Sequence, residues 1–89
     1  MITVVESAAF ARSVRKLIGD RPELEKRYRD RLQRFILDPH DPSLETHKLH
    51  GKLKESWAFS LTDKLRVVFL YLDAHTVLLQ NIGSHKQVY

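Results

Sequence analysis

Three side chains near the end of the chain are of the types that phosphate chemistry requires. Arg66 is the second residue of the apolar run 65–72, His85 follows a Gly-Ser pair, and Tyr89 is the last residue. An arginine can hold two phosphate oxygens at once, a histidine exchanges a proton near neutral pH, and a tyrosine can stack on a base or pass a proton. This combination predicts a protein that acts on RNA.

Arg66 has apolar neighbours along its strand, and burying an unpaired guanidinium would be very costly. We therefore expect its side chain on an open face of the sheet, where it could hold a phosphate and stabilise the extra charge of a pentacovalent transition state. The alternative is a structural salt bridge to Asp63 or Asp73. His85 alone equally fits a surface histidine. Chain ends usually fray, but Val88 and Tyr89 are large apolar side chains, so we expect the tail to fold back along the sheet.

A second group of basic side chains occupies the segment 47–54. It contains two histidines and three lysines: His47, Lys48, His50, Lys52 and Lys54. Such groups carry protons and stabilise charge where a phosphodiester is cleaved, although they equally fit a solvated basic loop. We expect no metal and no cofactor, because the two histidines lack the accompanying Cys, Asp or Glu spacing of known metal motifs.

The size and composition of the chain exclude several classes of protein. The 89 residues form one domain, 1–89, with 15 Lys and Arg against 11 Asp and Glu and a net charge of +4. That balance attracts polyanions or an acidic protein partner. Cysteine is absent, which excludes disulfides and thiolate metal sites. No apolar run reaches the roughly 20 residues of a membrane span, and the N-terminus lacks a signal-peptide pattern. We expect a cytoplasmic protein that does not contact membranes.

The first half of the chain predicts a short strand and two helices. Residues 2–5 are a β-branched run typical of a strand. Ser7 is placed to cap a helix that Gly19 ends, and Asp20 to cap a second helix that continues to Asp38-Pro39. The helical arginines, Arg12, Arg15, Arg27 and Arg31, resemble salt-bridged solvent faces.

The second half predicts a loop followed by a strand meander. Residues 39–55 contain two prolines, a glycine and three histidines, which is typical of a long loop that holds a helical turn or a strand edge. Three strands then follow with tight turns, at 57–61, 65–72 and 76–82. The expected fold is α+β: a two-helix hairpin packed on one face of a small twisted antiparallel sheet of about four strands, in the order β-α-α-β-β-β.

These elements, with the segments Lys48–Trp57, Leu65–Phe69 and Ile82–Tyr89, make the whole chain resemble the RelE/ParE superfamily of toxins from bacterial type II toxin-antitoxin pairs. The resemblance implies an mRNA interferase that cuts mRNA in the ribosomal A site. A ribose 2′-hydroxyl would attack the neighbouring phosphate without a metal. It also implies an acidic cognate antitoxin, mRNA and the ribosome as partners, and contact with operator DNA only through the antitoxin.

The resemblance further implies a role for each site residue. Arg66 falls where the family carries a strand arginine at the scissile phosphate. His47 aligns with a loop histidine of YafQ-like members and becomes the general base, His85 the acid, and Tyr89 an orienting or base-stacking group. The remaining basic residues would bind RNA phosphates: Lys48, His50, Lys52, Lys54 and Lys86. The chain departs from the YafQ pattern at Leu61 and Leu65, where a histidine and an aspartate are expected, so the division between acid and base stays open.

Two other functions remain open on the same fold. One is a ParE-like inhibitor of DNA gyrase, a binding protein that would not need proton-transferring residues. The other is a catalytically silent module that binds an antitoxin or an operator, which fold and positive charge alone would support.

Overall fold

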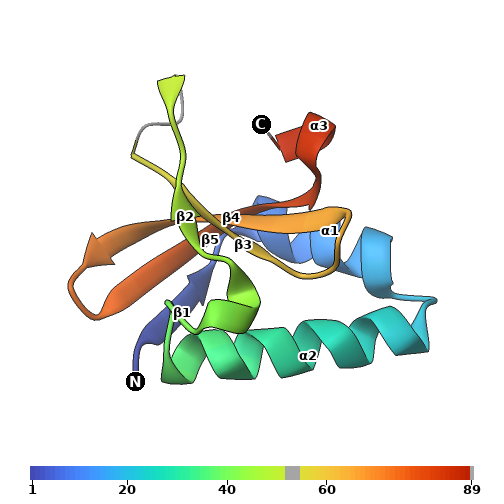
Figure 1. Cartoon of the computed structure of the whole chain (residues 1–89). Coiled ribbons are helices and arrows are strands. Elements are labelled where there is room, and N and C mark those ends of the chain that lie inside the picture. Colours follow the sequence, from blue (N-terminus) through green and yellow to red (C-terminus); the bar gives the residue numbers. More distant parts are fainter. Residues whose placement is uncertain (52–54, 89) are drawn as a thin grey trace.

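The computed structural model describes residues 1–51 and 55–88. Figure 1 shows α2 running along one side of a sheet and α3 standing on the opposite side. The elements in chain order are β1 (Thr3–Glu6), α1 (Ala8–Ile18), α2 (Pro22–Leu37), the 3-10 turn η1 (Pro42–Leu44), β2 (His47–Lys48), β3 (Trp57–Ser60), β4 (Leu65–Asp73), β5 (Thr76–Ser84) and α3 (His85–Val88). The α+β fold and the predicted order are confirmed, with β2, η1 and α3 added.

The sheet has five strands in the order β1-β5-β4-β3-β2. The meander β3-β4-β5 is antiparallel as expected, and β2 extends it beyond β3. At the other edge β1 runs parallel to β5, with Thr3 opposite Thr76. The sheet is therefore mixed rather than antiparallel. The sequence pattern could not fix the direction of β1, because helices and not a tight hairpin follow it.

The start of α1 has the predicted cap, whereas the start of α2 does not. The Ser7 side chain accepts a hydrogen bond from the Phe10 amide at 3.0 Å and begins α1 as predicted. The cap of α2 is Arg21, with no side-chain hydrogen bond, so the prediction that Asp20 caps it was wrong. Pro22 needs no amide partner in the first turn and starts that helix without one. The helix ends at Asp38 as predicted.

The main core lies between the helices and the sheet. Three phenylalanines form its centre: the Phe35 ring stacks on Phe59 at 4.5 Å and meets Phe69 edge-on at 4.8 Å between centroids. All three are fully or almost fully buried. Aromatic rings bury large areas, so this trio holds α2 against β3 and β4.

A second, smaller apolar cluster lies on the opposite face of the sheet. It consists of Leu49, Ala58, Val68 and Val88. Val88 is only 7% exposed, so the tail does fold back onto the sheet as expected, although it does so as the helical turn α3. No helix among the described residues is long and apolar enough to cross a membrane.

Candidate active site

Strand alternation places Arg66 on the sheet face opposite α2. Val67 and Phe69 belong to the core beneath the helices, and successive side chains of a strand point to opposite faces. Arg66 therefore shares its face with Val68, as predicted. Its neighbours across the sheet are Ser60 on β3 and Gly83 on β5. Neither partner has a large side chain.

Backbone carbonyls hold the Arg66 guanidinium. Its Nη1 donates to the carbonyl oxygens of Thr62 at 2.8 Å and Asp63 at 3.1 Å, both in the turn before β4, and to that of Leu65 at 3.2 Å. Among the described residues it forms no salt bridge, so the alternative of an ion pair with Asp63 or Asp73 is not found. Neutral carbonyls orient the group without cancelling its charge, so it can still attract an anion.

His85 reaches the same face of the sheet by way of β5 and α3. Gly83 is the direct partner of Arg66, and His85 follows two residues later as the exposed first residue of α3. The same helical turn buries Val88 against Ala58 and Val68. Arg66 and the helix that carries His85 therefore lie on one side of the molecule.

His47 lies on this face at the β2 edge. It pairs with Ala58 across the sheet, and its Nδ1 lies 3.0 Å from the carbonyl oxygen of Glu45. A carbonyl can only accept, so this contact favours the tautomer with the proton on Nδ1, in which Nε2 is the basic nitrogen. Glu45 itself adopts a left-handed conformation with φ of 52°. Such conformations are uncommon outside glycine and concentrate at functional sites.

The other predicted site residues are not all found on this face of the sheet. Lys48 pairs with Trp57, whose ring packs on the helix side of the sheet, so Lys48 points away from His47. His50 and Lys86 are exposed. Lys52, Lys54 and Tyr89 lie outside the described residues. Within residues 1–51 and 55–88, no three His, Asp or Glu side chains gather as a metal site would require.

One polar contact near the site was not predicted. The Ser56 hydroxyl donates to the Gln80 side-chain oxygen at 3.0 Å and joins the start of β3 to β5. Ser56 is only 5% exposed, and a buried polar group of this kind needs such a partner. Ser56 stands two positions before Ala58, and side chains two positions apart in a strand point to the same face. The sequence therefore offered a way to predict the face on which Ser56 lies.

Comparisons with solved structures identify the fold. YafQ from Escherichia coli superimposes with a TM-score of 0.80 at 14% identity, covering 100% of this chain and 99% of YafQ. A metal-bound toxin from Helicobacter pylori gives 0.79 at 24% identity, with full coverage of both chains. A YoeB–YefM complex from Staphylococcus aureus gives 0.75 at 12% identity, covering 96% and 98%.

No family model matches the chain, and no curated protein matches it significantly. At these identities the structural likeness establishes the fold and not the activity. The chain has the fold of the YafQ and YoeB toxins, and the predicted RelE/YoeB/YafQ-like toxin fold is confirmed.

Proposed function

We propose that this protein is the toxin of a type II toxin-antitoxin pair and cleaves mRNA in the ribosomal A site, in the cytoplasm. One observation carries the proposal: Arg66, His47 and the helical turn that begins with His85 occupy one face of the sheet. These residues supply a phosphate-binding cation and two proton carriers, which are the groups that RNA cleavage requires.

The proposed reaction is an internal transfer at phosphorus. The 2′-hydroxyl oxygen attacks the adjacent phosphate while His47 Nε2 accepts the hydroxyl proton. The bond from phosphorus to the 5′ oxygen then breaks, and His85 donates a proton to that leaving oxygen. Arg66 stabilises the charge that accumulates on the phosphorane oxygens. The products are a 2′,3′-cyclic phosphate and a 5′-hydroxyl, and the mechanism uses no metal. Tyr89 would orient or stack the base.

The fold also supports a protein partner. The Staphylococcus aureus structure is a complex of YoeB with YefM, and this chain has a net charge of +4. We propose a cognate antitoxin that is acidic, because opposite net charges speed association and favour the correct partner.

The test is cleavage of a defined, end-labelled mRNA on programmed ribosomes by the purified protein. We expect a cut within the A-site codon that leaves a cyclic phosphate, with little cleavage of the same RNA without ribosomes. Intact mRNA would contradict the proposal. A parallel DNA gyrase supercoiling assay covers the main alternative, and inhibition there without cleavage would favour the ParE-like function.

A further inference from the structure

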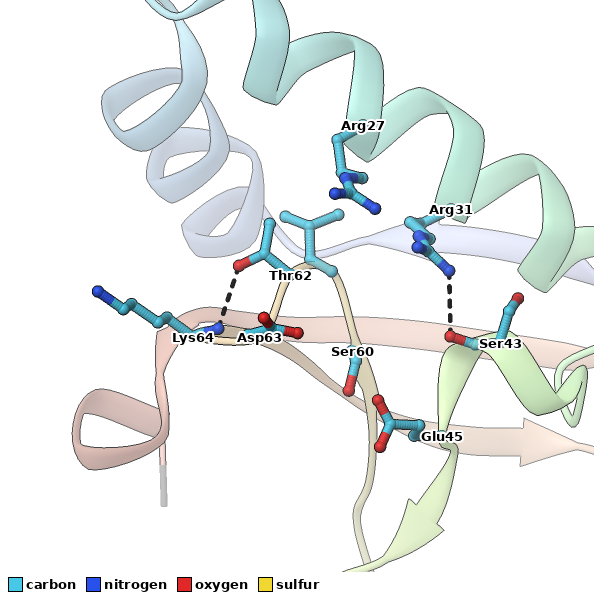
Figure 2. Close-up of a pocket in the computed structure, with 9 residues that line it drawn as sticks. Arg27, Arg31, Ser43, Glu45, Ser60, Thr62, Asp63 and Lys64 are labelled. Atoms are coloured by element: carbon cyan, nitrogen blue, oxygen red, sulfur yellow. Dashed lines mark hydrogen bonds between the residues drawn. The ribbon is translucent and has the colours of Figure 1, made fainter.

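A basic pocket lies outside the candidate active site, between α2 and the turn that joins β3 to β4. Figure 2 shows Arg27 and Arg31 projecting from α2 toward this turn. The pocket has a volume of about 310 Å³, and its described lining also includes Ser43 and Glu45 near η1 and the segment 60–64.

Arg31 carries a buried donor for which the described residues offer no acceptor. Its Nη1 donates to the Ser43 carbonyl oxygen at 3.0 Å and so ties η1 to α2. Its Nε is buried and has no hydrogen-bond partner among the described residues. Leaving a buried donor of a charged group unpaired is costly. The guanidinium of Arg31 therefore keeps hydrogen-bonding capacity that an acceptor in the pocket can use once a small shift of the side chain exposes Nε.

Among its described lining residues, the pocket holds three cations and two carboxylates, so positive charge is in excess. Arg27 and Arg31 are four residues apart on α2, a spacing at which like charges repel. Within the described part of the chain, the salt bridges on α2 join Arg29 to Glu25 and Arg34 to Asp30. Arg27, Arg31 and Lys64 form none. The carboxylates of Glu45 and Asp63 line the same pocket without pairing with these cations, so a bound anion would relieve the repulsion.

We propose that this pocket binds a phosphate group of RNA, at a position distinct from the scissile phosphate. A wider depression of about 830 Å³ adjoins it and shares Arg27, Thr62 and Lys64. That depression adds apolar surface from Leu24 and Leu65, where the sugar and base attached to the phosphate can lie. This extension favours a nucleotide chain over a free oxyanion.

The pocket and the candidate active site share one turn. Thr62 and Asp63 line the pocket, and their carbonyl oxygens hold the Arg66 guanidinium. An RNA that contacts Arg66 would reach the pocket by passing around this turn. The assignment of RNA as the ligand rests on the proposed function, whereas the anion site itself rests on the pocket.

The test measures binding of a short RNA whose sugars are all 2′-O-methylated, because such RNA cannot undergo the proposed cleavage. We expect Arg27→Gln and Lys64→Gln each to weaken binding about tenfold, as loss of one charge-assisted contact would. Each should also reduce the slope of log affinity against log salt by about 0.7. Glu45→Gln should strengthen binding, because it removes a negative charge from the pocket. Arg12→Gln, an exposed arginine of α1 outside the pocket, is the control with the same charge change.

A second measurement follows the Nε–H resonance of Arg31 by NMR in the wild-type protein. RNA should shift this resonance to saturation, and inorganic phosphate should do so only at much higher concentration. An unmoved resonance at saturating RNA would overturn the proposal, as would equal effects of Arg27→Gln and Arg12→Gln. Saturation by phosphate but not RNA would overturn the RNA assignment.

These outcomes separate the pocket from the reaction. If the wild-type protein binds RNA through the pocket but does not cut mRNA on ribosomes, the proposed function fails and the pocket stands. If it cuts mRNA and the pocket variants bind like wild type, the pocket assignment fails and the reaction stands.

Discussion

Arg66 and Gly83 are direct partners across β4 and β5. A glycine there leaves the arginine without a competing side chain, and the strand continues from Gly83 to the helical turn that carries His85. This pairing joins the phosphate-binding and proton-donating residues of the proposed reaction to one part of the sheet.

Arg66→Ala is expected to abolish growth inhibition in cells and to lower the cleavage rate on ribosomes by about 10²–10³-fold, as loss of a transition-state donor does. Arg66→Lys should recover only part of the rate, because lysine lacks the planar fork that binds two oxygens. Circular dichroism should show both variants folded. Full toxicity of Arg66→Ala would exclude this residue from the site.

His47→Gln and His85→Gln are expected to lower the cleavage rate by about 10²–10⁴-fold each. The pH profile of the residual activity distinguishes their roles. A general base must be deprotonated, so His47→Gln should remove the acidic limb, whereas His85→Gln should remove the alkaline limb. Exchanged limbs would reverse the assignment, and unchanged rates would refute it.

Val88→Ala is expected to lower the free energy of unfolding by about 1–2 kcal/mol, because it removes two buried methyl groups. It should also reduce cleavage, since α3 would lose its anchor on Ala58 and Val68. Denaturant titration measures the first effect. The matched control is Val5→Ala, a valine that is 41% exposed, which should change stability by less than about 0.5 kcal/mol.

Gly19→Ala is expected to destabilise the helical hairpin by about 1–3 kcal/mol. A β-carbon at position 19 would lie 2.5 Å from the Arg15 carbonyl oxygen, so the backbone must move. Thermal unfolding measures the loss. Gly51→Asn provides the comparison: Gly51 has φ of 72° with open space around it, and asparagine tolerates that conformation. A larger loss at Gly51 would contradict the steric explanation.

Stability should decline at alkaline pH because of Tyr28. Burial, and then the nearby Glu6 carboxylate that accepts its hydroxyl at 3.4 Å, raise the pKa of Tyr28. The folded state therefore keeps a proton that the unfolded state releases above about pH 10. The free energy of unfolding should be independent of this group below pH 10 and fall above it. Tyr28→Phe should remove that part of the decline in pH-dependent unfolding.

Sequence patterns correctly predicted the structural features that depend only on residues a few positions apart. The Ser7 cap and the alternation of Arg66 with Val67 are both visible within a few residues, and both are confirmed. The α3 turn was not predicted, because its stability comes from Val88 packing on residues that precede it by 20 or more positions. The direction of β1 depends in the same way on distant pairing.

The basic pocket could not be predicted for the same reason. Arg27 and Arg31 lie on one helix and were interpreted as a solvent face. They line a pocket because the segment 60–64 lies against this part of α2 and because η1 docks there through Arg31 and the Ser43 carbonyl. Their spacing of four residues, which places two like charges on one helix face, was the available signal. Of the candidate active-site residues Arg66 and His47, the sequence could suggest the types and positions, whereas their contacts with backbone carbonyls could not be predicted.

The pairing of Thr3 with Thr76 has a consequence for folding of the protein. Strand β1 cannot take its place in the sheet until β5 is available, and both long helices and three other strands lie between the two in the sequence. Contacts this distant in sequence form slowly. Placement of β1 is therefore expected to be a late step of folding, and its parallel pairing with β5 closes one edge of the sheet.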